Sequence, residues 1–390
     1  MLYPIGIQDF EKIRRDGYVY VDKTDLIYKM VQKGCYYFLS RPRRFGKSLL
    51  VSTMEAYFSG KKELFEGLSI SKLEKDWNQY PVLRFDFTGQ FYTTPYALED
   101  TLNTQLEALE KRFEINEPSG SAASRFRVLI DRAYESTGKP VVILIDEYDK
   151  PVVDNIADES LSDIFRKQLQ GFYSVMKAKD KYIKFGFLTG VTKIGKLSVF
   201  SGLNNLKDIS LDARYTNICG ISEKELKKYF KDSVRDLAEA NDISTKKCYS
   251  LLAQMYDGYH FRQNSAGIYN PFSVLSTFDS GEFDNYWFET ATPSFLVRFL
   301  QQGNYKLDDI NRDKVPVSML KGVNAERPNA ITLLYQTGYL TIKDYDPQFR
   351  RYGLGYPNKE VEDSFVESLS EFYTPIEKSP GELSADKFVE

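Results

Sequence analysis

Residues 36–48 have the sequence YYFLSRPRRFGKS, which predicts a buried strand, a tight loop and the start of a helix. The loop needs Gly46 so that backbone N–H groups can approach phosphate oxygens at the helix N-terminus. Lys47 supplies a positive charge to the same oxygens, and the Ser48 hydroxyl is a ligand for Mg²⁺. Such a loop usually opens with glycine, and here Arg41 stands at that position.

Apolar residues after this loop recur at helical spacing, so a helix follows it. A Gly-Lys-Ser turn also occurs by chance as a solvated basic turn, and that alternative is open until the rest of the chain is considered. If the loop binds phosphate, the nucleotide is expected to contact residues of the loop, of the helix start and of a later strand. These residues are Arg43, Arg44, Phe45, Gly46, Lys47, Ser48, Leu49 and Thr189.

The composition of the chain is that of a globular protein, with 390 residues, 42% hydrophobic and 27% charged. This length suits two or three domains, each with its own core. The net charge of −3 provides no global attraction for DNA or anionic membranes. Aromatic residues reach 15%, and we assign them to packing rather than to a base-stacking surface.

Cysteine and histidine are scarce in this chain. Cys35, Cys219 and Cys248 lie far apart, and His260 is the single histidine. This spacing argues against a zinc site, and unpaired cysteines fit a reducing compartment. We assign His260 to packing among aromatic residues. Because no signal peptide and no run of membrane-spanning length is present, we expect a cytoplasmic protein without a membrane partner.

Residues 141–149, VVILIDEYD, form the second informative stretch. Five continuous aliphatic residues indicate a central parallel strand that is buried on both faces. Its acidic end is where ligands bind in open α/β sheets. Asp146 is expected to hold Mg²⁺, and Glu147 to polarise the attacking water. Asp149 has two interpretations, a second acid of the site or a cap of the helix near Pro151.

Further strands and helices are predicted from the same kinds of pattern. The expected strands are residues 17–24, 81–87, 183–190 and 205–211, and the main expected helices are 96–113 and 124–135. Thr24 is expected to cap the helix that follows it. Thr189, with Thr192 nearby, is either a sensor of the γ-phosphate or a loop cap.

A strand between the phosphate loop and the acidic strand, with Glu147 beside Asp146, indicates the additional-strand, catalytic-glutamate branch of P-loop NTPases. The fold class is therefore α/β with a parallel sheet.

Several motifs match one protein family: residues 3–6 (YPIG), 20–24 (YVDKT), 40–48 (SRPRRFGKS), 144–149 (LIDEYD), 189–191 (TGV), 256–259 (YDGY) and 269–272 (YNPF). On these motifs the chain resembles the AAA-ATPase-like family of bacterial and archaeal proteins, often joined to a PD-(D/E)XK nuclease-like domain. The resemblance implies that Arg41 is usual at its position and compatible with an active site. It also implies ATP and Mg²⁺ as ligands and a DNA- or defence-related setting.

Three domains are expected: an ATPase core at 1–220, a helical lid at 221–305 and a winged-helix-like, helical region at 306–390 with a polar tail. Ser222 opens a capped helix expected to run to Asn241, and 246–256, the segment after 269 and 293–302 are further helices. A helix, a glycine and a strand are expected at 330–342, and a last helix near 356–373. No acidic strand with a Glu-x-Lys pattern follows, so we expect the nuclease-like domain to be absent.

The leading hypothesis is an ATPase that couples Mg-ATP hydrolysis to movement of the lid and C-terminal region. The alternatives are a slow nucleotide-dependent switch and an interaction module without significant turnover. Arg43 and Arg44 either neutralise phosphate charge or form a basic rim, and Arg214 is a further candidate charge stabiliser. The resemblance suggests nucleic acid or a nuclease-domain protein as a partner, and the oligomeric state stays open.

Overall fold

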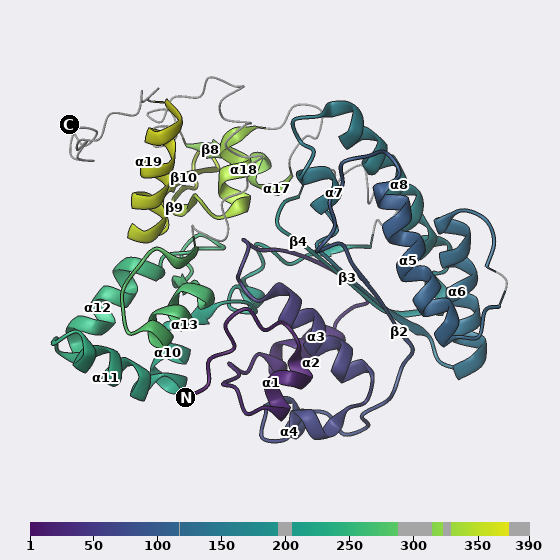
Figure 1. The fold of residues 1–390 in the computed structure, drawn as a ribbon, viewed down its shortest axis with the longest axis horizontal. Helices are drawn as coiled ribbons and strands as arrows, with labels where there is room; N and C mark the ends of the chain where they lie inside the picture. Colours follow the sequence, from purple (N-terminus) through teal and green to yellow (C-terminus); the bar gives the residue numbers. More distant parts are fainter. Residues whose placement is uncertain (117, 194–204, 288–313, 323–328, 374–390) are drawn as a thin grey trace.

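The computed structural model describes residues 1–116, 118–193, 205–287, 314–322 and 329–373. Its centre is a five-stranded parallel sheet with the order β2-β3-β4-β1-β5 (Figure 1). The strands are β1 (Tyr36–Ser40), β2 (Val82–Asp86), β3 (Val141–Asp146), β4 (Ile183–Gly190) and β5 (Lys207–Asp208). Every residue of β1 and β3 is buried, as their aliphatic and aromatic runs predict.

The strand order confirms the α/β class and the additional-strand P-loop NTPase fold. β4 lies between β1, which leads into the phosphate loop, and β3, which ends in acids. The expected additional strand was the one at 81–87, because it comes between the two in sequence. That strand is β2 and lies at the edge of the sheet, so the inserted strand is β4 instead.

Helices cover both faces of this sheet. The connection from β1 to β2 runs across the sheet in one direction, and the connections from β2 to β3 and from β3 to β4 run back in the other. Because such connections are right-handed, the helix between β1 and β2 lies on one face and the helices of the other two connections lie on the opposite face. α3 (Lys47–Phe58) lies on one face, with the N-terminal helices beside it, and the longer helices α5, α6 and α8 lie on the other (Figure 1). The remaining core elements are α1 (Phe10–Arg15), α2 (Thr24–Val31), η1 (Lys62–Phe65), α4 (Ile70–Leu73), α5 (Ala97–Arg112), α6 (Ala122–Thr137), α7 (Lys150–Val153), α8 (Glu159–Ala178), η2 (Asp180–Tyr182) and η3 (Ala213–Tyr215).

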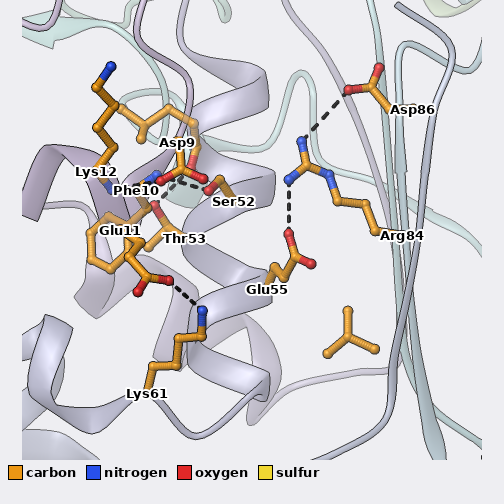
Figure 2. A network of polar contacts seen from close by, with 12 residues as sticks. Asp9, Phe10, Glu11, Lys12, Ser52, Thr53, Glu55, Lys61, Arg84 and Asp86 are labelled. Carbon is orange, nitrogen blue, oxygen red and sulfur yellow. Dashed lines mark hydrogen bonds and ion pairs between the residues drawn. The ribbon is translucent and has the colours of Figure 1, made fainter. Parts of the chain in front are cut away.

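Polar contacts fix helix α3 against its neighbours (Figure 2). The backbone N–H of Phe10 donates to Ser52 Oγ at 2.9 Å, which docks α1 onto α3. On the sheet side, the Arg84 guanidinium of β2 lies 2.9 Å from Glu55 of α3 and 3.7 Å from Asp86. Since α3 begins at Lys47, these contacts also fix the start of the helix relative to the strand ends.

The second group of helices has its own hydrophobic cluster. Its elements are β6 (Ile221–Ser222), α10 (Glu223–Tyr229), α11 (Lys231–Ala240), α12 (Thr245–Tyr256), β7 (Ile268–Tyr269) and α13 (Pro271–Ser280). The capping box that opens the first helix is present, because Ser222 and Glu225 cap each other's backbone N–H groups. The expected single helix to Asn241 is wrong, since the chain breaks at Phe230 into α10 and α11.

The C-terminal elements join the hydrophobic cluster of the sheet and its helices rather than that of the second group of helices. They are β8 (Val315–Pro316), α17 (Val317–Lys321), α18 (Ala330–Thr337), β9 (Thr341–Asp346), β10 (Arg351–Gly355) and α19 (Lys359–Tyr373), with a three-stranded sheet of order β8-β10-β9. The expected helix, glycine and strand at 330–342 are present. The expected helix at 293–302, the boundary at 306 and the polar tail lie outside the described residues.

Two local predictions near the N-terminus are wrong. Residues 18–23 form no strand, and none of the described strands pairs with them. Thr24 is the first residue of α2 rather than its cap, and its hydroxyl donates to Asp22.

The strand expected at 205–211 is present as β5 but is only two residues long. None of the described helices has the length and apolar character needed to cross a membrane.

Candidate functional site

The phosphate loop joins β1 to α3 and adopts the conformation that its glycine permits. Gly46 has a φ of 87°, in the left-handed region that favours glycine. Helix α3 begins at the next residue, so the free N–H groups of its first turn face the loop. These groups and the helix dipole are suited to bind an anion.

Lys47 turns its side chain back into the loop. Its Nζ donates to the backbone carbonyls of Arg41 and Pro42, each at 3.1 Å. The side chain is buried, with 4% of its surface exposed. An ammonium group held by two neutral carbonyls can exchange them for phosphate oxygens, which are stronger acceptors.

Asp146, at the end of β3, is fully buried beside Thr189 of β4. The Thr189 hydroxyl donates to Asp146 Oδ1, while Oδ2 is buried and has no hydrogen-bond partner among the described residues. An unsatisfied buried carboxylate oxygen is costly. A divalent cation bound by Oδ2 and the Ser48 hydroxyl would satisfy it, so the residues present fit Mg²⁺.

Glu147 follows directly and has an unusual backbone conformation. Its φ is 50°, which costs a residue with a side chain about 1–3 kcal/mol. Its N–H donates to Thr189 Oγ1 at 3.4 Å. Burial raises the pKa of the Glu147 carboxyl, and the positive charge of Lys47 partly offsets this shift. The positive charge of Lys47 therefore acts on this carboxylate.

Asp149 has a structural task that the sequence did not predict. Its carboxylate accepts from the Thr192 N–H at 2.6 Å, the Thr192 hydroxyl at 2.7 Å and the Val191 N–H at 3.2 Å. The helix-capping interpretation is wrong, because α7 has no side-chain cap hydrogen bond. Burial raises the pKa of Asp149, and the bonds from Thr192 act against that shift. Asp149 holds the turn that follows β4.

The loop arginines face neighbouring elements in this structure. The Arg43 guanidinium lies 3.9 Å from Asp154, and the Arg44 guanidinium lies 5.0 Å from the ring centre of Phe272 on α13. The third candidate cation, Arg214, forms an ion pair with Asp212 of its own turn.

A mainly apolar cavity of about 90 Å³ opens beside the loop. Three parts of the chain line it, namely the N-terminal segment, the loop with α3 and the lid: Pro4, Val19, Tyr20, Val21, Lys23, Phe45, Gly46, Leu49, Leu50, Ile218, Cys219, Gly220, Ile221, Phe230, Pro271 and Leu275. Of these, sequence reasoning named Phe45, Gly46 and Leu49 individually. The family motifs at 3–6 and 20–24 were the signal for the N-terminal part.

Sequence reasoning also missed a buried ion pair at the edge of this cavity. Lys23 Nζ lies 2.6 Å from Glu225, and both side chains are largely buried. Burial lowers the pKa of Lys23, and the charge of Glu225 counteracts this effect. The pair ties the N-terminal segment to α10. Among the described residues, no group of three or more His, Cys, Asp or Glu side chains could hold a metal ion.

The role of Asp149 in the turn leads to a prediction about stability. Asp149→Ala leaves three buried donors without an acceptor, so we expect the free energy of unfolding to fall by about 3–5 kcal/mol. Urea denaturation measures the loss, with Asp163→Ala as the control. Asp163 pairs with Arg166 and Lys167 at the surface, so its loss should cost less than about 1 kcal/mol. Equal losses in the two variants would contradict the role of Asp149.

Comparisons with known proteins agree with this geometry. A family model described as "Predicted AAA-ATPase" matches residues 4–200. An uncharacterized protein in the vnfD 5' region of Azotobacter chroococcum mcd 1 is 38% identical over 376 residues, which are 95% of this chain and 70% of that protein. The Aeropyrum pernix ORC2 protein, solved as ADPNP-ADP complexes, aligns over 89% of this chain and 93% of its own, at 10% identity and with a TM-score of 0.32. The chain belongs to the predicted AAA-ATPase family, the AAA-ATPase-like proteins.

Proposed function

We propose that this protein binds ATP with Mg²⁺ and hydrolyses it, and that the reaction moves the lid and the C-terminal elements. One observation supports the proposal most directly. Lys47, the unpaired Oδ2 of Asp146 and the carboxylate of Glu147 lie together at the carboxyl edge of the sheet. Cation, metal ligand and base are the groups that phosphoryl transfer to water requires.

ATP binding in this proposal uses the loop and the neighbouring cavity. The N–H groups at the start of α3 and the Lys47 ammonium hold the β- and γ-phosphates. The cavity beside Gly46 is mainly apolar, so it suits the flat base of the nucleotide. Tyr20 lines that cavity, but its ring packs edge-on against Phe10 at 5.0 Å, so we assign it to packing rather than to stacking on the base.

Hydrolysis in this proposal depends on Glu147. When bound, Mg²⁺ supplies positive charge to the phosphates, and Ser48 and Asp146 are the residues that hold it. Glu147 takes a proton from water as the water oxygen bonds to the γ-phosphorus and the bond to the leaving ADP oxygen breaks. Its position beside Asp146, with its N–H bonded to Thr189 Oγ1, keeps the carboxylate at the end of β3 where the water would lie.

Contacts between the loop and the rest of the chain would carry the movement. The carbonyl of Arg43 accepts from Trp287 Nε1 at 3.1 Å, and Arg44 lies over Phe272 of the lid. At the C-terminal end, Glu360 of α19 accepts from both Ser273 of α13 and the N–H of Trp287. A change in the conformation of the loop would therefore alter contacts with both the lid and the C-terminal elements.

Lys47→Ala tests the binding half of the proposal. The variant loses a charge-assisted contact worth on the order of 1.5–3 kcal/mol, so ATP affinity should fall by roughly 10- to 100-fold. Isothermal titration calorimetry in the presence of Mg²⁺ measures this. Lys150→Ala is the matched control, because Lys150 lies near the same sheet edge and pairs with Asp154. If the folded Lys47→Ala protein binds ATP as tightly as the control, the loop is not the phosphate site.

Glu147→Gln separates an enzyme from a nucleotide-dependent switch. Glutamine keeps the volume but not the basicity, so turnover should fall by roughly 10²–10⁴-fold while ATP affinity changes by less than about threefold. Steady-state phosphate release, with and without added nucleic acid, measures turnover. Negligible turnover by the unaltered protein, together with ATP-dependent protection of the lid from protease, would favour the switch. Equal activity in the variant would place the base elsewhere.

A further inference from the structure

Arg41 occupies the position where a phosphate loop usually opens with glycine, and its side chain is almost completely enclosed. Only 1% of its surface is exposed. A long charged side chain is rarely buried without a compensating role. Its contacts therefore indicate what it contributes to the loop.

The guanidinium of Arg41 donates to backbone carbonyls from three places in the core. Nη1 donates to the carbonyls of Ser40 and Ser210, each at 2.9 Å, and Nη2 donates to the carbonyl of Tyr215 at 3.0 Å. Ser40 ends β1, Ser210 follows β5 and Tyr215 ends η3. The side chain thus joins the base of the loop to the segment beyond the edge strand.

The same guanidinium lies on an aromatic ring. Its Cζ is 3.9 Å from the ring centre of Phe261, which also packs edge-on against Phe45 of the loop at 5.6 Å. No carboxylate of the described residues lies within ion-pair distance of Arg41. The nearest groups that accept from the guanidinium are carbonyls, and the charge of Asp208 acts on it only from beyond ion-pair distance. The positive charge is therefore not paired directly with a carboxylate at the base of the loop.

The backbone of Arg41 is engaged at the same time. Its N–H donates to the carbonyl of Gly190 at the end of β4, at 3.2 Å. Its own carbonyl accepts from Lys47 Nζ at 3.1 Å. Fixing the Arg41 side chain therefore fixes the backbone that contacts both the lysine and the neighbouring strand.

We propose that Arg41 is a positioning residue of the phosphate site, whose buried guanidinium holds the loop backbone in place and adds positive potential for the phosphates. The proposal rests on the proposed function, since it concerns the same ATP site. Glycine at position 41 would leave the carbonyls of Ser40, Ser210 and Tyr215 without the guanidinium donor. Lysine would keep the charge but could not reproduce the planar fork that serves carbonyls from separate segments.

The test compares Arg41→Lys with Arg14→Lys. The Arg14 guanidinium also donates to backbone carbonyls, those of Leu64 and Glu66, but away from the loop. Titration calorimetry with Mg-ATP and competition binding with adenosine give the ratio of the two affinities. Adenosine has no phosphates, so it reports on the base cavity alone.

For Arg41→Lys we expect ATP affinity to fall at least about 10-fold, while adenosine affinity stays within about threefold. Arg14→Lys should leave both affinities unchanged. Two results would overturn the proposal: unchanged ATP affinity in Arg41→Lys, or an equal loss for ATP and adenosine, which a role in packing alone would produce. If the unaltered protein binds no ATP, the proposed function fails, and this proposal fails with it.

If Arg41→Lys does not fold, as judged by circular dichroism, Phe261→Leu tests the same role of the Arg41 guanidinium. This variant keeps the carbonyl contacts of Arg41 and removes the ring that lies against both the guanidinium and Phe45. We expect the ratio of ATP to adenosine affinity to fall by about 3- to 30-fold, the range expected for a desolvated cation–π contact. A ratio within twofold of that of the unaltered protein would overturn the proposal.

Discussion

The parallel register of β1, β4 and β3 is the constraint on which the site depends. Ser40 of β1 pairs with Gly190 of β4, and Ile145 of β3 pairs with Leu188, so the three strands end at the same edge. A phosphate loop leaving β1 and acids ending β3 are therefore neighbours, although about a hundred residues separate them in the chain. Thr189 lies between the two strands and bonds to Asp146 across the sheet.

The electrostatic balance at this edge explains why the charged side chains tolerate burial. Lys47 and Arg41 are held by backbone carbonyls rather than by carboxylates. Asp149 is compensated by donors from one turn, whereas Asp146 has one oxygen unpaired and Glu147 has a raised pKa. Within the described residues, two cations without an ion-pair partner and one carboxylate oxygen without a donor suit the arrival of a phosphate and a metal ion together.

Local patterns in the sequence predicted the strands and the loop, but not the contacts between distant segments. A continuous aliphatic run predicted β3, and Ser222 predicted the capped start of the helix that follows it. The position of β4 inside the sheet depends on strand order, which no local pattern encodes. The Lys23–Glu225 pair and the lid part of the cavity were missed for the same reason, since these residues meet only in the folded chain. The use of Asp149 in a turn was missed because its donors lie beyond the next strand.

A crystal structure with Mg²⁺ and a non-hydrolysable ATP analogue tests the central claim most directly. The account predicts that Lys47 Nζ leaves the carbonyls of Arg41 and Pro42 and contacts the phosphates. Asp146 Oδ2 should face the metal, directly or through water, and the base should occupy the cavity beside Gly46. A nucleotide bound elsewhere, with Lys47 still on both carbonyls, would contradict the account.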